Sequence, residues 1–249
     1  MAAVSPHAPH VRRRTADRLR PVRITPDFIT NADGSCLIAV GRTRVVCTAT
    51  IENRIPRWLL GKDCGWVTAE YGMLPASTGE RVRRPGPGGT SSRGTEIRRL
   101  IGRALRAGMR LDALGANQVI VDCDVLEADG GTRCAAITGG WVALARAVAR
   151  GRADGRLPAD TANPIAEQVT AVSCGLVDGR PLLDLDYADD SRASVDANIV
   201  MTAAGRLIEV QASGEEATFS GADLSRLLRL ARTGCKTLAK HQARAVQRT

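Results

Sequence analysis

Aromatic side chains are scarce in this sequence of 249 residues, at 3% of the total. Proteins that bind single-stranded nucleic acid without sequence preference stack the bases on aromatic rings, so a stacking platform is excluded as the main binding device. The core must instead be built from Val, Leu, Ile and Ala. Hydrophobic residues make up 44% of the chain, which is ample for one large domain or two modest ones.

Histidine is nearly absent as well. His7 and His10 lie in a proline-containing N-terminal stretch, and His241 lies close to the C-terminus. A Ser-His-Asp triad or a histidine acid–base pair therefore has no convincing residues. A Walker phosphate loop is also missing, because Gly130-Gly131-Thr132 is not followed by Lys-Ser/Thr at the required spacing. Kinase-like transfer from ATP thus loses its usual signature.

The cysteines lack the spacing of a metal site or a disulfide framework. All seven are scattered and none forms a Cys-x-x-Cys pair: Cys36, Cys47, Cys64, Cys123, Cys134, Cys174 and Cys235. We expect most of them to be small core residues in a reducing cytoplasm. No apolar stretch approaches the length of a membrane span, and the basic N-terminus lacks the apolar segment of a signal peptide. These absences predict a soluble cytoplasmic protein with no membrane partner.

Positive charge, by contrast, is abundant. The chain carries 35 Lys and Arg against 26 Asp and Glu, a formal net charge of +9. This balance favours a polyanionic partner such as nucleic acid. A basic, arginine-rich proteome would produce the same charge, so the charge alone does not decide between the two.

The order of the expected elements predicts an α+β fold with mixed β-sheets packed against helices. We expect a disordered tail over residues 1–12, followed by a single domain over residues 13–249. Expected strands cover residues 35–40, 43–51, 118–126, 169–177, 181–187, 198–202 and 206–211. Helical spacing occurs at residues 97–105, after Gly131 and from about Ala222. Residues 79–94 are expected to form a long, functional or disordered loop.

The run Asp129-Gly130-Gly131-Thr132-Arg133 links the strand at residues 118–126 to a helix. Two glycines let the backbone pass close to a bound group, the threonine offers a hydroxyl, and the arginine supplies a charged fork. The free N–H groups and positive dipole end of a helix already attract anions at this point. The run is therefore a candidate phosphate site, although a Gly-Gly turn before a helix is more often only a tight connection.

A cluster of carboxylates forms the second candidate site. Asp184, Asp186, Asp189 and Asp190 follow one another closely, with Asp196 a little further on. If the strand stays regular, Asp184 and Asp186 project from the same face. Clustered carboxylates repel one another and need solvent, a cation or a shared proton. Hard oxygen ligands in small number suit Mg²⁺ alongside substrate phosphates, and the alternative is a solvated acidic turn.

Taken together, these residues favour one reaction: attack by inorganic phosphate on a phosphodiester. Phosphate is already an anionic nucleophile and needs little deprotonation, so histidine is dispensable. It must instead be held against another anion, which demands fixed positive charge, and a metal offsets charge on the phosphoryl group under attack.

Several long motifs resemble those of the ribonuclease PH family, from about Arg18 to the final helix. They are Gly65-Trp66-Val67-Thr68-Ala69-Glu70-Tyr71-Gly72-Met73-Leu74-Pro75, residues 93–106 with Arg93 at their start, Asp122-Cys123-Asp124-Val125-Leu126 with the following Ala128 to Arg133, Asp184-Leu185-Asp186-Tyr187 with Asp190-Ser191, and Ile208-Glu209-Val210-Gln211.

The resemblance implies a ribonuclease PH-like fold and a phosphate-dependent 3′→5′ exoribonuclease that trims tRNA precursors and other RNA 3′ ends. The products would be nucleoside 5′-diphosphates, and the reverse reaction would be that of a tRNA nucleotidyltransferase. The family's phosphate-binding positions fall on Arg93 and on Gly131, Thr132 and Arg133. Its two catalytic, metal-associated aspartates fall on Asp184 and Asp190. Asp196 matches a further acidic position of the family.

The resemblance also implies a homohexamer, built as a trimer of dimers, whose arginine-rich loop contacts tRNA through Arg81, Arg83 and Arg84. The chain departs from the family at one place, because many relatives carry arginine where Ala76 stands. That departure affects the detail of tRNA binding rather than the chemistry. The alternative function is a catalytically silent, RNA-binding ring subunit of exosome type. Such subunits usually lose the phosphate arginines or the aspartate pair, and both sets are present here.

Overall fold

The computed structural model describes residues 14–84, 91–215 and 217–247. Its helices and strands follow one another in an α+β order, as the sequence predicts. In chain order they are β1 (Val22–Pro26), β2 (Gly34–Val40), β3 (Thr43–Glu52), β4 (Trp66–Met73), α1 (Ser92–Ala107), β5 (Gln118–Glu127), α2 (Thr132–Ala153), β6 (Val169–Val177), β7 (Arg180–Leu183), α3 (Tyr187–Asp190), β8 (Ala193–Thr202), β9 (Leu207–Gly214) and α4 (Gly221–Gln247). Short 3-10 turns occupy Arg57–Leu59 and Asp112–Leu114.

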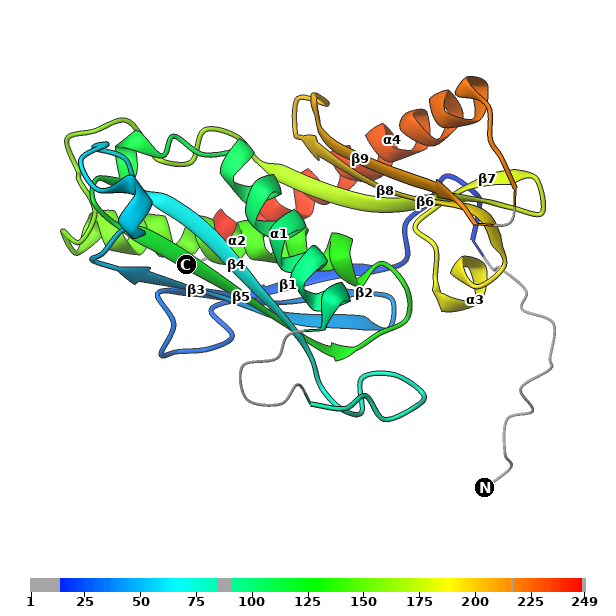
Figure 1. The fold of residues 1–249 in the computed structure, drawn as a ribbon, viewed down its shortest axis with the longest axis horizontal. Helices are drawn as coiled ribbons and strands as arrows, with labels where there is room; N and C mark the ends of the chain where they lie inside the picture. Colours follow the sequence, from blue (N-terminus) through cyan, green and yellow to red (C-terminus); the bar gives the residue numbers. More distant parts are fainter. Residues whose placement is uncertain (1–13, 85–90, 216, 248–249) are drawn as a thin grey trace.

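The strands form two separate sheets (Figure 1). The first sheet has five strands in the order β1-β2-β3-β5-β4, and only the β4–β5 pair within it is parallel. Helix α1 provides the crossover that this parallel pair requires. The second sheet has four antiparallel strands in the order β7-β6-β8-β9.

Helix α2 lies between the two sheets. It contacts β2, β3 and β5 of the first sheet and β6 and β8 of the second. Its sequence is apolar on nearly every side, which is typical of a helix with no solvent face. Gly139 allows the closest approach, because a Cβ there would lie 2.7 Å from Ile38 and 2.8 Å from the Cys47 sulfur. Helix α2 therefore packs directly against β2 and β3 of the first sheet at Gly139.

Helix α4 covers the other face of the second sheet, so β6 is buried on both faces. Val172, Cys174 and Leu176 face the cluster that contains Leu227 and Leu238 of α4. The helix reaches back to α2, where the Gln242 side-chain amide donates to the carbonyls of Thr138 and Val169 at 3.0 and 2.8 Å. This packing joins the C-terminal end of the chain to the central helix.

Several predicted elements are confirmed with small shifts of their ends. The strands expected at residues 35–40, 43–51, 118–126 and 169–177 are β2, β3, β5 and β6. Asp178 and Gly179 both have positive φ, as a two-residue hairpin turn of the expected type requires. Strand β8 begins five residues earlier than expected, at Ala193.

Two boundary predictions are wrong. The strand expected over residues 181–187 ends at Leu183, because Asp184 adopts a left-handed φ of 58°. The expected loop at residues 79–94 ends sooner, since Ser91 caps α1 by accepting from the Gly94 N–H at 3.0 Å.

The expected tail at residues 1–12 and residues 85–90 of the expected loop lie outside the described residues. Along the described part of the chain, no helix combines the length and the apolar character that a membrane span needs. All seven cysteines are free thiols, and all but Cys64 are buried.

Candidate active site

The turn before α2 has the backbone geometry that its two glycines predict. Gly130 and Gly131 have φ values of +75° and +70°, a region that other residues rarely adopt. Gly130 also has no room for a side chain, because a Cβ there would lie 2.5 Å from the Leu185 carbonyl oxygen. The turn is thus pressed against residues 185–186, which lie far away in the sequence.

Thr132 begins α2 directly after this turn, with Gly131 as the N-cap. Gly131 has no side chain to cap the helix, so the first N–H groups of α2 remain available to an anion. The Tyr71 hydroxyl donates to Thr132 Oγ1 at 3.0 Å. Because Thr132 accepts from Tyr71, its own hydrogen is free to point toward a bound oxyanion.

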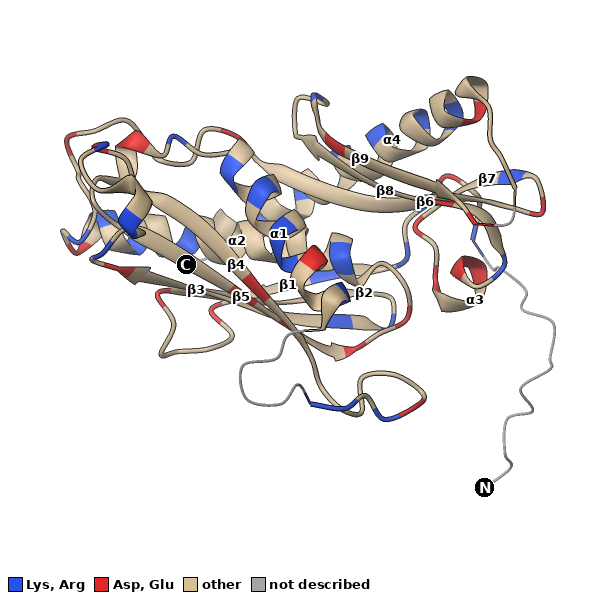
Figure 2. Ribbon diagram, viewed as in Figure 1, with Lys and Arg blue, Asp and Glu red and all other residues tan. Residues whose placement is uncertain are grey.

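Two arginines add positive charge at this helix end. Arg133 is the second residue of α2, and its Nη2 lies 3.0 Å from Glu96 Oε2. Its Nε is buried and has no hydrogen-bond partner within the described chain. Arg93 lies in the first turn of α1. Burial raises the pKa of Tyr71, and the charges of Arg93 and Arg133 act in the opposite direction. Figure 2 shows further basic residues along α1.

Asp190 faces the same positive charges. Burial raises the pKa of Asp190, the charge of Asp196 raises it further, and Arg133 and Arg93 act in the opposite direction. Its side chain still reaches solvent, which places it at the rim of a crowded site. The structure therefore brings Arg93, Arg133 and Asp190 together from three separate elements, α1, α2 and α3.

Asp190 and Asp196 can contribute to a cation site. One Asp196 carboxylate oxygen is buried without a hydrogen-bond partner among the described residues. Mg²⁺ is commonly held by one or two carboxylates, with water and substrate phosphates completing its shell. In the described ranges no group of three or more His, Cys, Asp or Glu side chains is arranged to hold a metal. This donor set fits a cation shared with a substrate rather than one enclosed by protein.

Asp184 has a different environment from Asp190. Its carboxylate lies in a buried ion pair with Arg20, with Asp184 Oδ1 2.7 Å from Arg20 Nη2. The expectation that Asp184 and Asp186 share one strand face is wrong, because the strand has already ended. Asp186 instead caps the short helix α3, accepting from the Asp189 N–H at 2.9 Å.

The arginines predicted to contact RNA lie on the loop after β4. Arg81, Arg83 and Arg84 are all exposed, and Figure 1 shows this loop extending beyond the end of the strand. Ala76 is exposed at the start of the same loop. Contact between these three arginines and RNA stays a prediction.

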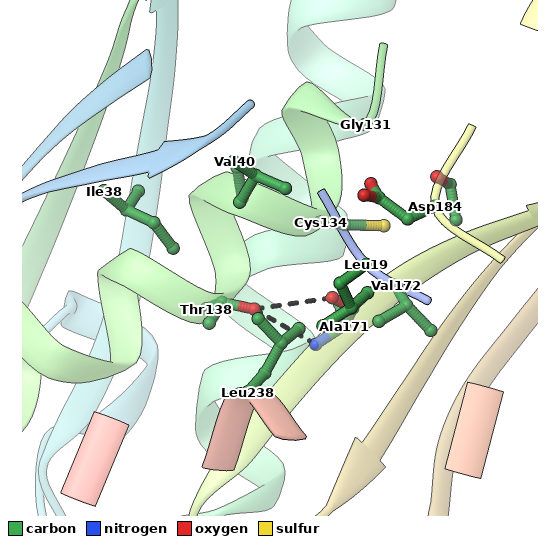
Figure 3. A pocket seen from close by; sticks show the side chains of 12 residues that line it. Leu19, Ile38, Val40, Gly131, Cys134, Thr138, Ala171, Val172, Asp184 and Leu238 are labelled. Carbon is green, nitrogen blue, oxygen red and sulfur yellow. Dashed lines mark hydrogen bonds between the residues drawn. The ribbon is translucent and has the colours of Figure 1, made fainter. Parts of the chain in front are cut away.

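A small internal cavity of about 20 Å³ lies beneath the turn (Figure 3). Figure 3 shows Gly131 and Asp184 at one end of it and Leu238 at the other. Most of its lining is apolar, and its volume suits a single water molecule rather than a nucleotide. The cavity is therefore too small to be the substrate site, and Arg93, Arg133 and Asp190 do not line it.

Reasoning from the sequence missed Arg20 as a member of this site. No local pattern identifies it, because its partners Asp129 and Asp184 are 109 and 164 residues away. Tyr71 lies within the motif of residues 65–75, but the motif alone does not indicate what the side chain does. Its hydrogen bond to Thr132 spans 61 residues and is likewise set by tertiary packing.

Comparison with known proteins decides the family. The model of domain 1 of the 3′ exoribonuclease family matches residues 18–149, and the model of domain 2 matches residues 167–234. The chain belongs to the 3′ exoribonuclease family. Within this family member, the turn before α2 and Arg20 fall in the first matched region, while Asp184, Asp190 and Asp196 fall in the second. The candidate site therefore joins the two regions.

The curated relatives of this 3′ exoribonuclease family member include proteins named ribonuclease PH. One from Neisseria meningitidis serogroup C is 53% identical and covers 94% of this chain and 96% of its own. Another, from Cereibacter sphaeroides, is 52% identical, and the match covers 94% of this chain and 98% of the relative. The resemblance predicted from the sequence motifs is thereby confirmed.

Solved structures show the same fold at lower sequence identity. Rice Rrp46 superimposes with a TM-score of 0.75 at 19% identity, covering 94% of this chain and 99% of that protein. An archaeal exosome core chain gives a TM-score of 0.74 at 21% identity, with coverages of 92% and 89%. At these identities the likeness establishes the ribonuclease PH-like fold alone.

Proposed function

We propose that this protein is a phosphate-dependent 3′→5′ exoribonuclease that removes 3′-terminal nucleotides as nucleoside 5′-diphosphates. The observation that carries this proposal is the buried Nε of Arg133 at the open N-terminus of α2, which has no hydrogen-bond partner among the described residues. The charge of Arg133 also acts on the carboxyl group of Asp190. A buried donor without an acceptor is costly, and a bound oxyanion would remove that cost. The relatives named ribonuclease PH support the same activity.

In this mechanism the free N–H groups of α2, the Thr132 hydroxyl and the side chains of Arg93 and Arg133 hold the attacking phosphate. An oxygen of hydrogen phosphate attacks the terminal phosphorus of RNA, and the bond from that phosphorus to the 3′ oxygen of the preceding nucleotide breaks. The proton that hydrogen phosphate loses is the one that the departing 3′ oxygen requires, so charge and atoms balance. The fixed arginines offset the repulsion between two anions, which is the main barrier to this reaction.

We propose Asp190, with Asp196 beside it, as the carboxylates that hold Mg²⁺. Asp184, the other aspartate that the sequence resemblance associates with the metal, is instead paired with Arg20. When bound, Mg²⁺ supplies charge neutralisation at the phosphoryl group under attack. The raised pKa of Asp190 reflects burial and the charge of Asp196, and a cation would relieve that repulsion.

We further propose tRNA precursors as the main substrates, contacted through Arg81, Arg83 and Arg84. The reverse reaction would extend RNA 3′ ends from nucleoside diphosphates. Cytoplasmic location and assembly into a hexamer, a trimer of dimers, are part of the same proposal. The exosome-core neighbours support a ring-forming fold, and a solution mass from light scattering tests the hexamer.

Strict dependence on phosphate tests the reaction. The protein is incubated with a 3′-extended tRNA, Mg²⁺ and inorganic phosphate, and the released nucleotides are separated by charge. Nucleoside diphosphates that appear only with phosphate support the proposal. Release of monophosphates without phosphate would instead identify a hydrolase.

The exosome-like fold favours one alternative, a catalytically silent ring subunit that binds RNA. This alternative predicts RNA binding without release of any nucleotide. The structural neighbours that suggest it are only 19–21% identical to this chain, far below the relatives named ribonuclease PH.

A further inference from the structure

Arg20 is an almost fully buried arginine, with 6% of its surface exposed, and it contacts both regions that form the candidate site. Its Nε and Nη2 lie 3.0 and 2.7 Å from the two carboxylate oxygens of Asp184. Its backbone N–H donates to Asp184 Oδ2 as well, at 2.7 Å. The planar guanidinium thus forms a two-point contact with this carboxylate, the strongest geometry for such a pair.

The same guanidinium also holds the turn before α2. Its Nη1 donates to the Asp129 carbonyl, and its Nη2 lies 3.2 Å from the Gly130 carbonyl oxygen. Thr43 supports the turn from β3: its hydroxyl donates to the Gly130 carbonyl at 2.7 Å and accepts from the Asp129 N–H at 3.0 Å. We call Arg20 and Thr43 the turn clamp.

Asp184 is itself fixed on the side away from Arg20. Its backbone N–H donates to the Ser173 carbonyl at 2.7 Å, and the next N–H, that of Leu185, donates to Ser173 Oγ at 3.1 Å. Ser173 lies in β6, whose two faces are both buried. The position of Asp184 is therefore set by the second sheet. Arg20, bound to Asp184, in turn positions the carbonyl groups of Asp129 and Gly130.

Charge and shape explain why this residue must be arginine. Burial by itself would lower the pKa of Arg20, but the hydrogen bond and charge of Asp184 outweigh it, so the guanidinium stays charged. A lysine would keep the charge but has one donor group instead of a rigid fork, so it cannot reach Asp184 and both carbonyls together.

We propose that Arg20 is a positioning residue, which, with Thr43, sets the place of the phosphate-binding turn relative to the carboxylates. It fixes Thr132 and Arg133 of α2 against the segment that carries Asp190. In this arrangement both Asp184 oxygens are engaged by Arg20, so Asp184 acts through the turn clamp, and direct contact with a cation falls to Asp190 and Asp196. The kinetic part of this inference rests on the proposed phosphate-dependent activity.

The first test compares Arg20→Lys with a matched control, Arg23→Lys. Arg23 is an exposed arginine in β1, three residues after Arg20. Steady-state rates are measured against phosphate and against RNA separately. We expect Arg20→Lys to raise the KM for phosphate by about tenfold or more, the scale for a misplaced binding group, with the KM for RNA nearly unchanged. Arg23→Lys should leave both values as they are. A fall in kcat with both KM values unchanged would overturn the proposal, because a smaller fraction of folded protein would explain that result.

A second pair of variants covers the case in which Arg20→Lys does not fold. Thr43→Val removes the hydroxyl from the turn clamp at almost constant volume and leaves the Arg20–Asp184 pair intact, whereas Thr43→Ser retains the hydroxyl. We expect a smaller rise in the phosphate KM for Thr43→Val and recovery in Thr43→Ser. Identical phosphate KM values for wild type and Thr43→Val would contradict a clamp on this turn.

Hydrogen exchange gives a readout that does not depend on activity. Amide exchange in a peptide that covers residues 129–133 should speed up in Arg20→Lys and Thr43→Val, while exchange in α4 stays at the wild-type rate. Uniform acceleration throughout the chain would show general destabilisation and overturn the positioning role. If the wild type proves independent of phosphate, the proposed reaction fails, yet the exchange result still decides whether the clamp holds the turn.

Discussion

Tyr71 donates its phenolic hydrogen to Thr132 Oγ1 at 3.0 Å and thereby orients the hydroxyl at the start of α2. The two residues belong to different elements, because Tyr71 lies in β4 and Thr132 begins α2. Burial raises the pKa of Tyr71, so it remains a hydrogen-bond donor throughout the neutral range.

Tyr71→Phe should therefore weaken phosphate use without removing a charge. Loss of one neutral hydrogen bond is worth about 1 kcal/mol, so we expect a rise of roughly fivefold in the KM for phosphate. The KM for RNA and the melting temperature should change little. Unchanged phosphate kinetics would show that the Thr132 hydroxyl does not contact phosphate.

Arg133→Ala should weaken the apparent affinity for phosphate well before it weakens that for tRNA. The arginine lowers the free-energy cost of bringing an anion to the N-terminus of α2. Its loss removes a charge-assisted contact, so we expect the apparent affinity for phosphate to fall by about tenfold or more. Arg150→Ala, an exposed position near the other end of the same helix, is the matched control. A larger effect on tRNA than on phosphate would make Arg133 an ordinary RNA contact.

Asp190→Asn should reduce turnover by at least about a hundredfold, the scale for loss of one charge-stabilising group, and leave tRNA binding largely intact. Binding by fluorescence anisotropy and turnover by nucleotide release separate the two effects. Asp178→Asn, at the exposed hairpin tip between β6 and β7, controls for a change of charge alone. Full turnover in Asp190→Asn would mean that the catalytic carboxylate lies elsewhere.

Thiol chemistry should distinguish Cys64 from the other six cysteines. Burial raises the pKa of Cys235 to about 11 and also raises those of Cys134 and Cys174, so their thiols stay protonated and inaccessible. A thiol reagent should modify Cys64 alone in the native protein. After denaturation the same reagent should modify all seven cysteines. Native labelling that persists in Cys64→Ser would show that a buried cysteine opens to solvent.

His241 predicts a small loss of stability in mild acid. Burial lowers its pKa, with Arg244 lowering it further, from an ordinary value of 6.5. Below that value the unfolded chain binds a proton that the folded chain does not, so stability falls as the pH falls toward the folded pKa. His241 shares a groove with Arg23 and Arg244, which opposes protonation. On acidification, the melting temperature of His241→Gln should therefore fall less than that of the wild type. An equal fall in both proteins would contradict this effect.

Local patterns were enough to predict much of the fold. Strands β2, β3 and β5 follow from alternating side chains, and the turn at Asp178 and Gly179 follows from residue types that accept positive φ. The end of β7 could not be predicted in this way. Asp184 leaves the strand with a left-handed φ, and its carboxylate pairs with Arg20 in a contact that spans 164 residues.

The amino-acid sequence by itself determined the residue types of the candidate site and the motifs that indicate the family. Glycines at 130 and 131, the hydroxyl of Thr132 and the charges of Arg93, Arg133 and Asp190 are local properties and can be read in order along the chain. Only the tertiary structure decided which environment, and so which role, each of these residues has. Asp184 and Asp190 are both aspartates six positions apart, yet one lies buried against Arg20 and the other reaches solvent beside Arg133. The physical reason is that a carboxylate's role depends on the charges and donors around it, and packing of distant segments brings those neighbours together.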